Sequence, residues 1–114
     1  MKTIYQQTVF GILVIFNLFA STSVQAKGVI TDIEVKSGIA YFQLSTLKNS
    51  VATCVSEDHK QLWSVDVTAN SNQGTYLMLL SAVNSALTLE VTSAQDCRLA
   101  PGIERVKSIT VVTP

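Results

Sequence analysis

Hydrophobic and polar residues alternate over much of the chain after Gly28, a pattern typical of short β-strands with one buried face. Turn-forming residues such as Ser37-Gly38 and Pro101-Gly102 separate these segments. The pattern between 51 and 67 fits either a hairpin or one bent strand with an insertion. The predicted strands cover residues 29–36, 39–44, 51–55, 87–92 and 103–112.

One segment, 74–86, has helical rather than alternating spacing. Its apolar residues predict a helix that buries Tyr76, Leu80 and Val83. This helix falls between the third and fourth predicted strands. The resulting order predicts a mainly β domain: a small five-stranded OB-like Greek-key barrel with one α-helix between strands 3 and 4.

The first 26 residues have the features of a secretory signal peptide. An apolar run at 9–20 follows Lys2, and Val24 and Ala26 form a small-x-small cleavage pattern. The run is shorter than the roughly 20 residues that a membrane span needs. We therefore expect cleavage after Ala26, a single domain at 27–114 without a membrane span, and a periplasmic or secreted location.

Charge is balanced in the predicted mature chain. The whole sequence has 8 Lys and Arg and 8 Asp and Glu, and Lys2 is the only one of these 16 residues before residue 27. Residues 27–114 therefore carry seven positive and eight negative side chains, a net charge of −1. No basic stripe is present, so the charge pattern argues against nucleic-acid binding.

Cys54 and Cys97 are the only cysteines of the chain. An even number of cysteines in an exported protein predicts a disulfide between them. Closing a loop of this length stabilises a domain by about 4 kcal/mol in the chain-entropy treatment. A catalytic or metal-binding thiol is the alternative, but the sequence has no CxxC motif and only one histidine to support it.

The sequence offers little catalytic chemistry. His59 is the only histidine and lies in a strongly polar turn, where we expect it to face solvent. Asp32 and Glu34 alternate onto one strand face and are also expected to be solvated. We therefore predict no catalytic residues, no metal site, no cofactor and no enzyme activity.

Two aromatic residues are candidates for ligand contact. Trp63 shares an apolar strand face with Val65 and Val67, which favours a place in the core. Tyr41 shares its face with Ile39 and Gln43 and is more open. The outer side of the first three strands is the usual ligand face of OB barrels, so Tyr41 is the predicted ligand-face residue.

A set of scattered positions carries a family resemblance: Gly28 to Thr31, Tyr41-Phe42, Cys54, Trp63 and the helix with the strand after it. At these positions the chain resembles the B subunits of subtilase cytotoxin and of its pertussis-like and typhoid-toxin relatives. The resemblance implies an OB fold, a pentameric ring and binding of cell-surface glycans. The toxin segment that contacts glycans precedes the first strand and has no counterpart in a chain that begins at Lys27. None of the family's sugar-binding residues therefore transfers to this sequence.

The leading hypothesis is an exported, non-enzymatic binding domain with a glycan or a protein as its partner, similar to a toxin B subunit and assembled as a homo-oligomer. The alternative hypothesis is a small periplasmic structural or interaction protein without a glycan site.

Overall fold

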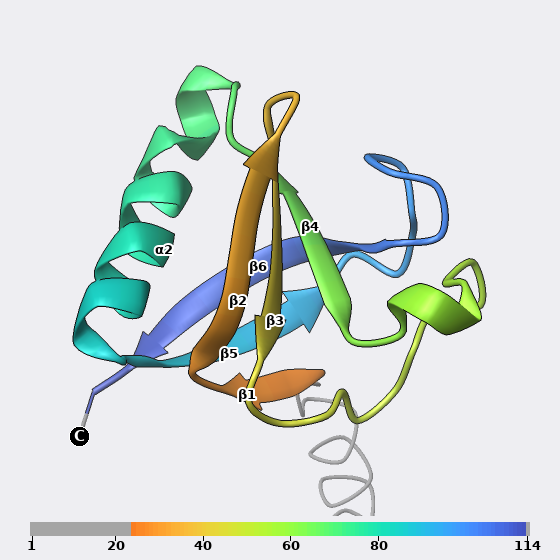
Figure 1. Ribbon diagram of the computed structural model, residues 1–114, viewed down its shortest axis with the longest axis horizontal. Coiled ribbons are helices and arrows are strands. Elements are labelled where there is room, and N and C mark those ends of the chain that lie inside the picture. The colour runs from red at the N-terminus through yellow and green to blue at the C-terminus, as the bar shows by residue number, and fades with distance from the viewer. Residues whose placement is uncertain (1–23, 114) are drawn as a thin grey trace, which may run out of the picture.

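The computed structural model describes residues 24–113, so most of the predicted signal peptide lies outside the described residues (Figure 1). The domain is mainly β, as predicted, with one α-helix, α2 (Gln73–Ser85), and two short 3-10 helices, η1 (Glu57–His59) and η2 (Asn70–Asn72). The strands are β1 (Ala26–Gly28), β2 (Ile30–Lys36), β3 (Ile39–Leu44), β4 (Leu62–Asp66), β5 (Thr88–Ser93) and β6 (Glu104–Val112).

These six strands form one mixed sheet in the order β1-β5-β6-β4-β3-β2, so the structure has six strands in a mixed sheet in place of the predicted five-stranded barrel. Neighbouring strands are antiparallel except β4 and β6, which are parallel. The predicted strand 29–36 is present as β2, but an additional strand, β1, precedes it across Val29: β1 pairs with β5, whereas β2 pairs with β3. Strands β1 and β2 are therefore the two edge strands of the sheet, although only Val29 separates them in sequence. This connection requires a strongly curled sheet.

Close contact between Val29 and the end of β3 holds this curl in place. Ser45 N donates to Val29 O at 2.8 Å, and Val29 N donates to Ser45 Oγ at 3.1 Å. Gly28 permits the approach, because a Cβ at this position would lie only 2.7 Å from Ser45 Oγ. A glycine before the break thus lets the chain leave β1 and enter β2 at the opposite edge.

The segment before β4 also differs from the prediction. Residues 51–55 are not a strand, so neither the hairpin nor the bent strand expected over 51–67 forms. This stretch is held instead by a disulfide at Cys54 and by a turn in which Val55 N donates to Ala52 O. These local constraints outweigh the strand propensity of its valines.

The predicted helix is present as α2, but it lies between β4 and β5 and buries a different face. Leu79 and Ala82 are fully buried, whereas Leu80 and Val83 remain 38% and 41% exposed. Apolar residues lie on most sides of this helix, so their spacing does not identify the inner face. Ala86 adopts a left-handed conformation (φ 51°) and ends the helix.

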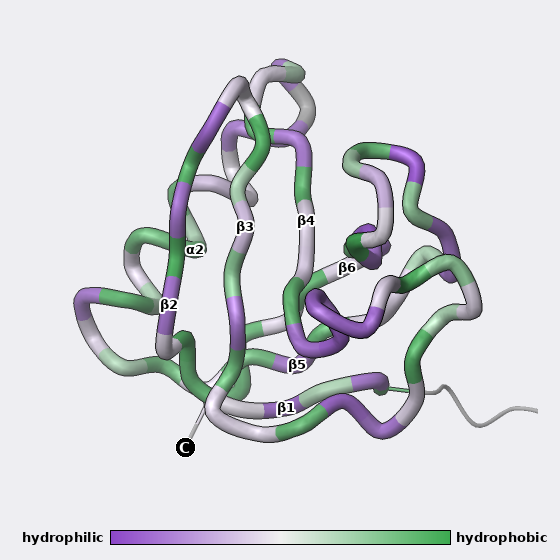
Figure 2. Tube along the Cα trace, turned by 45° about the vertical axis from the view of Figure 1, so that its right-hand side comes forward, coloured by the Kyte–Doolittle hydropathy of each residue, from purple (hydrophilic) through white to green (hydrophobic). Residues whose placement is uncertain are grey.

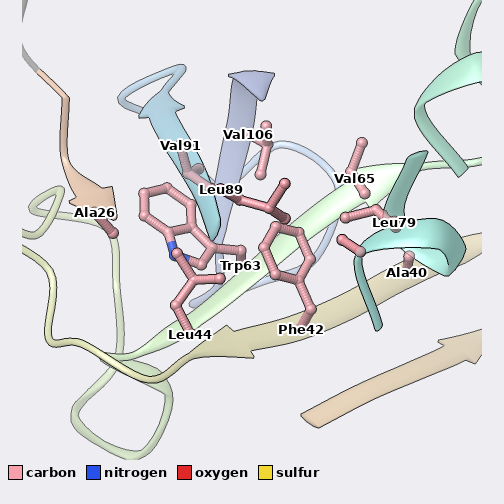
Figure 3. Packing of buried hydrophobic residues seen from close by; sticks show 11 residues of the cluster. Ala26, Ala40, Phe42, Leu44, Trp63, Val65, Leu79, Leu89, Val91 and Val106 are labelled. Carbon is pink, nitrogen blue, oxygen red and sulfur yellow. The ribbon is translucent and has the colours of Figure 1, made fainter. Parts of the chain in front are cut away.

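The core lies between α2 and the curled sheet (Figure 3). Trp63 and Phe42 are its largest fully buried side chains, and the prediction of Trp63 as a core residue is confirmed. In Figure 3 the side chains of Leu79 from α2 and Phe42 from β3 point toward one another, with Leu89 beside them. Packing α2 on this side of the sheet leaves the opposite face of β2 and β3 open to solvent.

Residues before Lys27 contribute to the fold. Ala26 belongs to the core at 2% exposure, and Gln25 is 6% exposed. Gln25 N donates to Val91 O at 3.0 Å, and Gln25 Oε1 accepts from Ser93 N at 3.1 Å. The expected cleavage after Ala26 would therefore separate three described residues, Val24 to Ala26, from the domain.

Candidate ligand-binding site

A hollow of about 620 Å³ lies on the outer side of the β2–β3 hairpin. Figure 2 shows these two strands side by side, with purple and green alternating along β2 as hydrophilic and hydrophobic residues alternate. The volume of the hollow is within the range of small-molecule sites in proteins, roughly 300–1,000 Å³. The polar side chains that line it include Asp32, Glu34, Lys36, Tyr41, Gln43 and His59.

The hairpin register brings the polar residues of β2 and β3 onto one face. Glu34 lies opposite Tyr41 and Asp32 opposite Gln43, and directly opposed residues of antiparallel strands point to the same side. The two-residue turn sets this register: both Ser37 and its neighbour Gly38 have positive φ, as a tight hairpin turn requires. Tyr41 is half-buried in the hollow, which is where its predicted role as a ligand-face residue requires it to be.

The charged residues of β2 are available to a ligand. Asp32, Glu34 and Lys36 are exposed, as expected for the two carboxylates. None of the ion pairs formed within residues 24–113 involves them. The wall formed by β2 therefore presents two carboxylates and one ammonium group without a charge partner in the described chain.

His59 forms part of the opposite wall. It is half-buried at the end of η1, and its Nδ1 lies 2.9 Å from Ser56 Oγ. The polar sequence around His59 suggested full solvation and contained no sign of the hollow, because the partners that complete it come from β2 and β3. The Ser56–His59 contact joins two residues of the same turn and supplies no third group of a triad.

The predicted disulfide is confirmed and anchors the loop that carries His59. Cys54 and Cys97, 43 residues apart in sequence, have Cα atoms 6.1 Å apart and form the bond. Next to it, Ser56 N donates to Gly102 O at 3.0 Å. These contacts hold the loop before η1 against the segment that leads into β6.

A buried ion pair anchors the other end of this loop. Lys48 Nζ lies 3.2 Å from Glu104 Oε1, and the two side chains are 1% and 0% exposed. Lys48 Nζ also donates to Leu62 O at 2.7 Å and lies 4.2 Å from the centroid of the Trp63 ring. Burial lowers the pKa of Lys48, and the carboxylate of Glu104 partly opposes that shift.

No signal in the sequence identifies this pair. Lys48 lies in the polar run 45–50, which reads as a loop, and Glu104 lies in a strand with alternating polar residues. Both positions are typical of solvated charges, and only the fold brings them together across 56 residues.

A second charged pair fixes the loop after β5. Arg105 donates from Nε to Asp96 Oδ1 at 2.8 Å and from Nη2 to Asp96 Oδ2 at 2.7 Å. The hydrogen bonds from Arg105, with a smaller contribution from Arg98, lower the pKa of Asp96 to about 2, although desolvation acts in the opposite direction. This pair lies next to Cys97 and holds the disulfide-bearing loop on β6.

Residues 24–113 contain no group of three His, Cys, Asp or Glu side chains placed to hold a metal ion. Within the same residues, no helix has the length and apolar character needed to cross a membrane. The hollow at Tyr41 combines an aromatic ring with polar and charged side chains. No known protein family, curated protein or solved structure matches this chain.

Proposed function

We propose that this chain is an exported, non-enzymatic binding domain that holds a saccharide in the hollow at Tyr41. The observation that carries the proposal is the combination, in one open hollow, of an aromatic ring with several unpaired hydrogen-bonding side chains. A tyrosine ring offers an apolar surface for the C–H groups of a sugar ring and a hydroxyl for hydrogen bonding. The disulfide is compatible with the expected periplasmic or extracellular location.

The charge of the hollow favours a neutral or amine-bearing sugar. Asp32 and Glu34 provide carboxylate oxygens that accept hydrogen bonds from hydroxyl and amine groups, and Gln43 both donates and accepts. Lys36 is the only lysine or arginine in the lining, so the charges of Asp32, Glu34 and Lys36 sum to −1. An acidic sugar would bring a further negative charge to this site, which like-charge repulsion disfavours.

We also infer an OB-like architecture in which β1 and β2 are the two halves of one interrupted strand. They are separated only by Val29, and joining them reduces the count to five strands around a partly open, curled sheet. The hollow would then lie on the face that OB domains commonly use for oligosaccharides. The toxin-like pentameric ring remains a prediction of the resemblance alone and is not needed for this proposal.

A glycan array with the purified protein tests the proposal, followed by calorimetry on the retained sugar with Tyr41→Ala. Loss of the ring should weaken binding about tenfold or more, because aromatic contacts contribute on the order of 1–3 kcal/mol. Tyr76→Ala is the matched control, since Tyr76 is also half-buried but lies on α2, outside the hollow. An array without neutral or amino-sugar hits, or equal affinities for both variants, would overturn the proposal.

The alternative, a periplasmic interaction protein without a sugar site, has an observation of its own. Three large apolar side chains of α2 are exposed: Leu77 at 63%, Leu80 at 38% and Val83 at 41%. Exposed apolar groups on one element are typical of protein contact surfaces. Retention of a protein partner by a domain that binds no sugar would favour this alternative.

A further inference from the structure

The outer edge of β2 is a candidate surface for strand pairing. Within residues 24–113, β2 has β3 as its only neighbour in the sheet. Figure 2 shows β2, β3 and β4 in succession, with β2 outermost. The strand is seven residues long and contains no proline, and its one irregularity lies at its beginning, between Ile30 and Asp32. Such an edge can accept another strand.

The hairpin register identifies the backbone groups that point outward. The residues that flank a tight two-residue turn, here Lys36 and Ile39, form a hydrogen-bonded pair. Alternation then makes Val35 and Ala40 a non-hydrogen-bonded pair, so the N–H and C=O groups of Val35 point away from β3. The same holds for Ile33, two residues earlier.

Exposed apolar side chains near this edge also favour contact with another protein chain. Val35 is 46% exposed, although it points to the core side of the hairpin. Helix α2 packs against β2 on that side, as Figure 1 shows, and bears the exposed residues Leu77, Leu80 and Val83. The helix contains no charged residue, so two copies of it would meet without charge repulsion.

We propose that a second copy of this chain pairs with the edge, β2 against β2 in antiparallel orientation about a two-fold axis at Val35. The charges of β2 distinguish this register from its neighbours. Pairing centred on Val35 places Glu34 opposite Lys36 of the other copy twice. Pairing centred on Glu34 forms two Asp32–Lys36 pairs but also places two Glu34 carboxylates face to face, and pairing centred on Ile33 places Asp32 opposite Glu34 twice. Only the Val35 register combines two attractive pairs with no like-charge pair.

The two-fold arrangement would extend the sheet and join two outer faces. Opposed residues of antiparallel strands point to the same side, so Glu34 and Lys36 of both copies lie on the face that carries the hollow. If the hollow binds a saccharide as proposed above, the dimer presents two sites on one continuous surface. The pairing itself needs no ligand.

Analytical ultracentrifugation of the purified protein over a range of concentrations tests the proposal. The unchanged protein should show a monomer–dimer equilibrium. Lys36→Glu should raise the dimer Kd about tenfold or more, because two attractive pairs become repulsive. The exchange Glu34→Lys with Lys36→Glu should return the Kd to its original range. Lys107→Glu, an exposed charge change on β6, is the control and should leave the Kd unchanged.

Val35→Pro provides an independent test of the backbone pairing. It removes an N–H group that β3 does not use, so the hairpin is retained while the partner strand loses a donor. Circular dichroism should show an unchanged fold and sedimentation a monomer. The proposal is overturned by a protein that stays monomeric, or by a dimer that neither Lys36→Glu nor Val35→Pro weakens. A dimer weakened by Lys36→Glu but not restored by the exchange would overturn the Val35 register.

Discussion

At the scale of single residues, the buried ion pair of Lys48 and Glu104 is the part of the core with the largest free-energy cost of removal from water. Removing an ammonium and a carboxylate group from water costs several kcal/mol for each ion, and their attraction offsets this only if hydrogen bonds complete the pair. Glu104 Oε2 has no hydrogen-bond partner among the described residues, whereas Oε1 contacts both Lys48 Nζ and Ala52 N. We therefore attribute to this pair a role in placing the 45–61 loop rather than a large net stabilisation.

This view predicts a strongly non-additive mutant cycle. Lys48→Met alone should lower the free energy of unfolding by about 3–5 kcal/mol, because it leaves Glu104 buried and unpaired. The double variant Lys48→Met with Glu104→Leu should lie within about 1–2 kcal/mol of the original protein, since both charges are then gone. Urea unfolding at neutral pH measures both values.

The exposed pair Lys27–Glu90 is the control for this cycle. Its ammonium and carboxylate oxygen are 3.6 Å apart, and the lysine side chain is 57% exposed. Lys27→Met should therefore change the free energy of unfolding by less than about 1 kcal/mol. A double variant that is as destabilised as Lys48→Met or more so, or a loss at Lys27 as large as that at Lys48, would contradict the role given to the buried pair.

At the scale of elements, the residues just before β1 close the curled sheet. Gln25 O accepts from Asn49 N, and Val24 O accepts from Asn49 Nδ2 at 2.9 Å. Together with the hydrogen bonds from Gln25 to β5, these contacts join residues 24 and 25 to the sheet and to the loop after β3. A chain that starts at Lys27 lacks all of them and the buried methyl group of Ala26.

A chain that begins at Val24 should therefore be more stable than one that begins at Lys27. We expect a difference of about 2–4 kcal/mol in the free energy of unfolding, from several hydrogen bonds of roughly 1 kcal/mol each. Denaturant titrations of the two chains give this difference directly. Equal stabilities would show that the contacts of Val24 to Ala26 do not stabilise the domain. The intact mass of the exported protein would show at which residue the chain begins in the cell.

Sequence patterns predicted the elements better than their connections. The hairpin at 30–44, the helix and the last two strands follow from periodicity, and the disulfide follows from the count of cysteines. Strand β1 and the change of pairing partner across Val29 could not be predicted in this way, because the alternation at 29–36 describes β2 alone and does not indicate which strand each segment pairs with. The buried face of α2 was missed for a related reason: Leu79 and Leu80 are equally apolar, and only the sheet determines which one is covered.

At the scale of the whole molecule, the curled sheet has two sides with different roles. Its inner side packs on α2 around Trp63, and its outer side carries the hollow with Tyr41. Tyr41 was expected on this face from strand alternation, but His59 was not, because its place depends on the disulfide-anchored loop. We propose that this outer hollow receives the ligand, and not the exposed apolar residues Leu77, Leu80 and Val83 of α2.

An NMR titration of the isotope-labelled protein with neutral and amino-sugar oligosaccharides tests this claim most directly. We expect saturable shifts of backbone amide signals in β2 and β3 and around His59, with sialylated sugars causing smaller shifts at equal concentration. Unchanged spectra with every neutral and amino sugar, or shifts confined to α2, would contradict it.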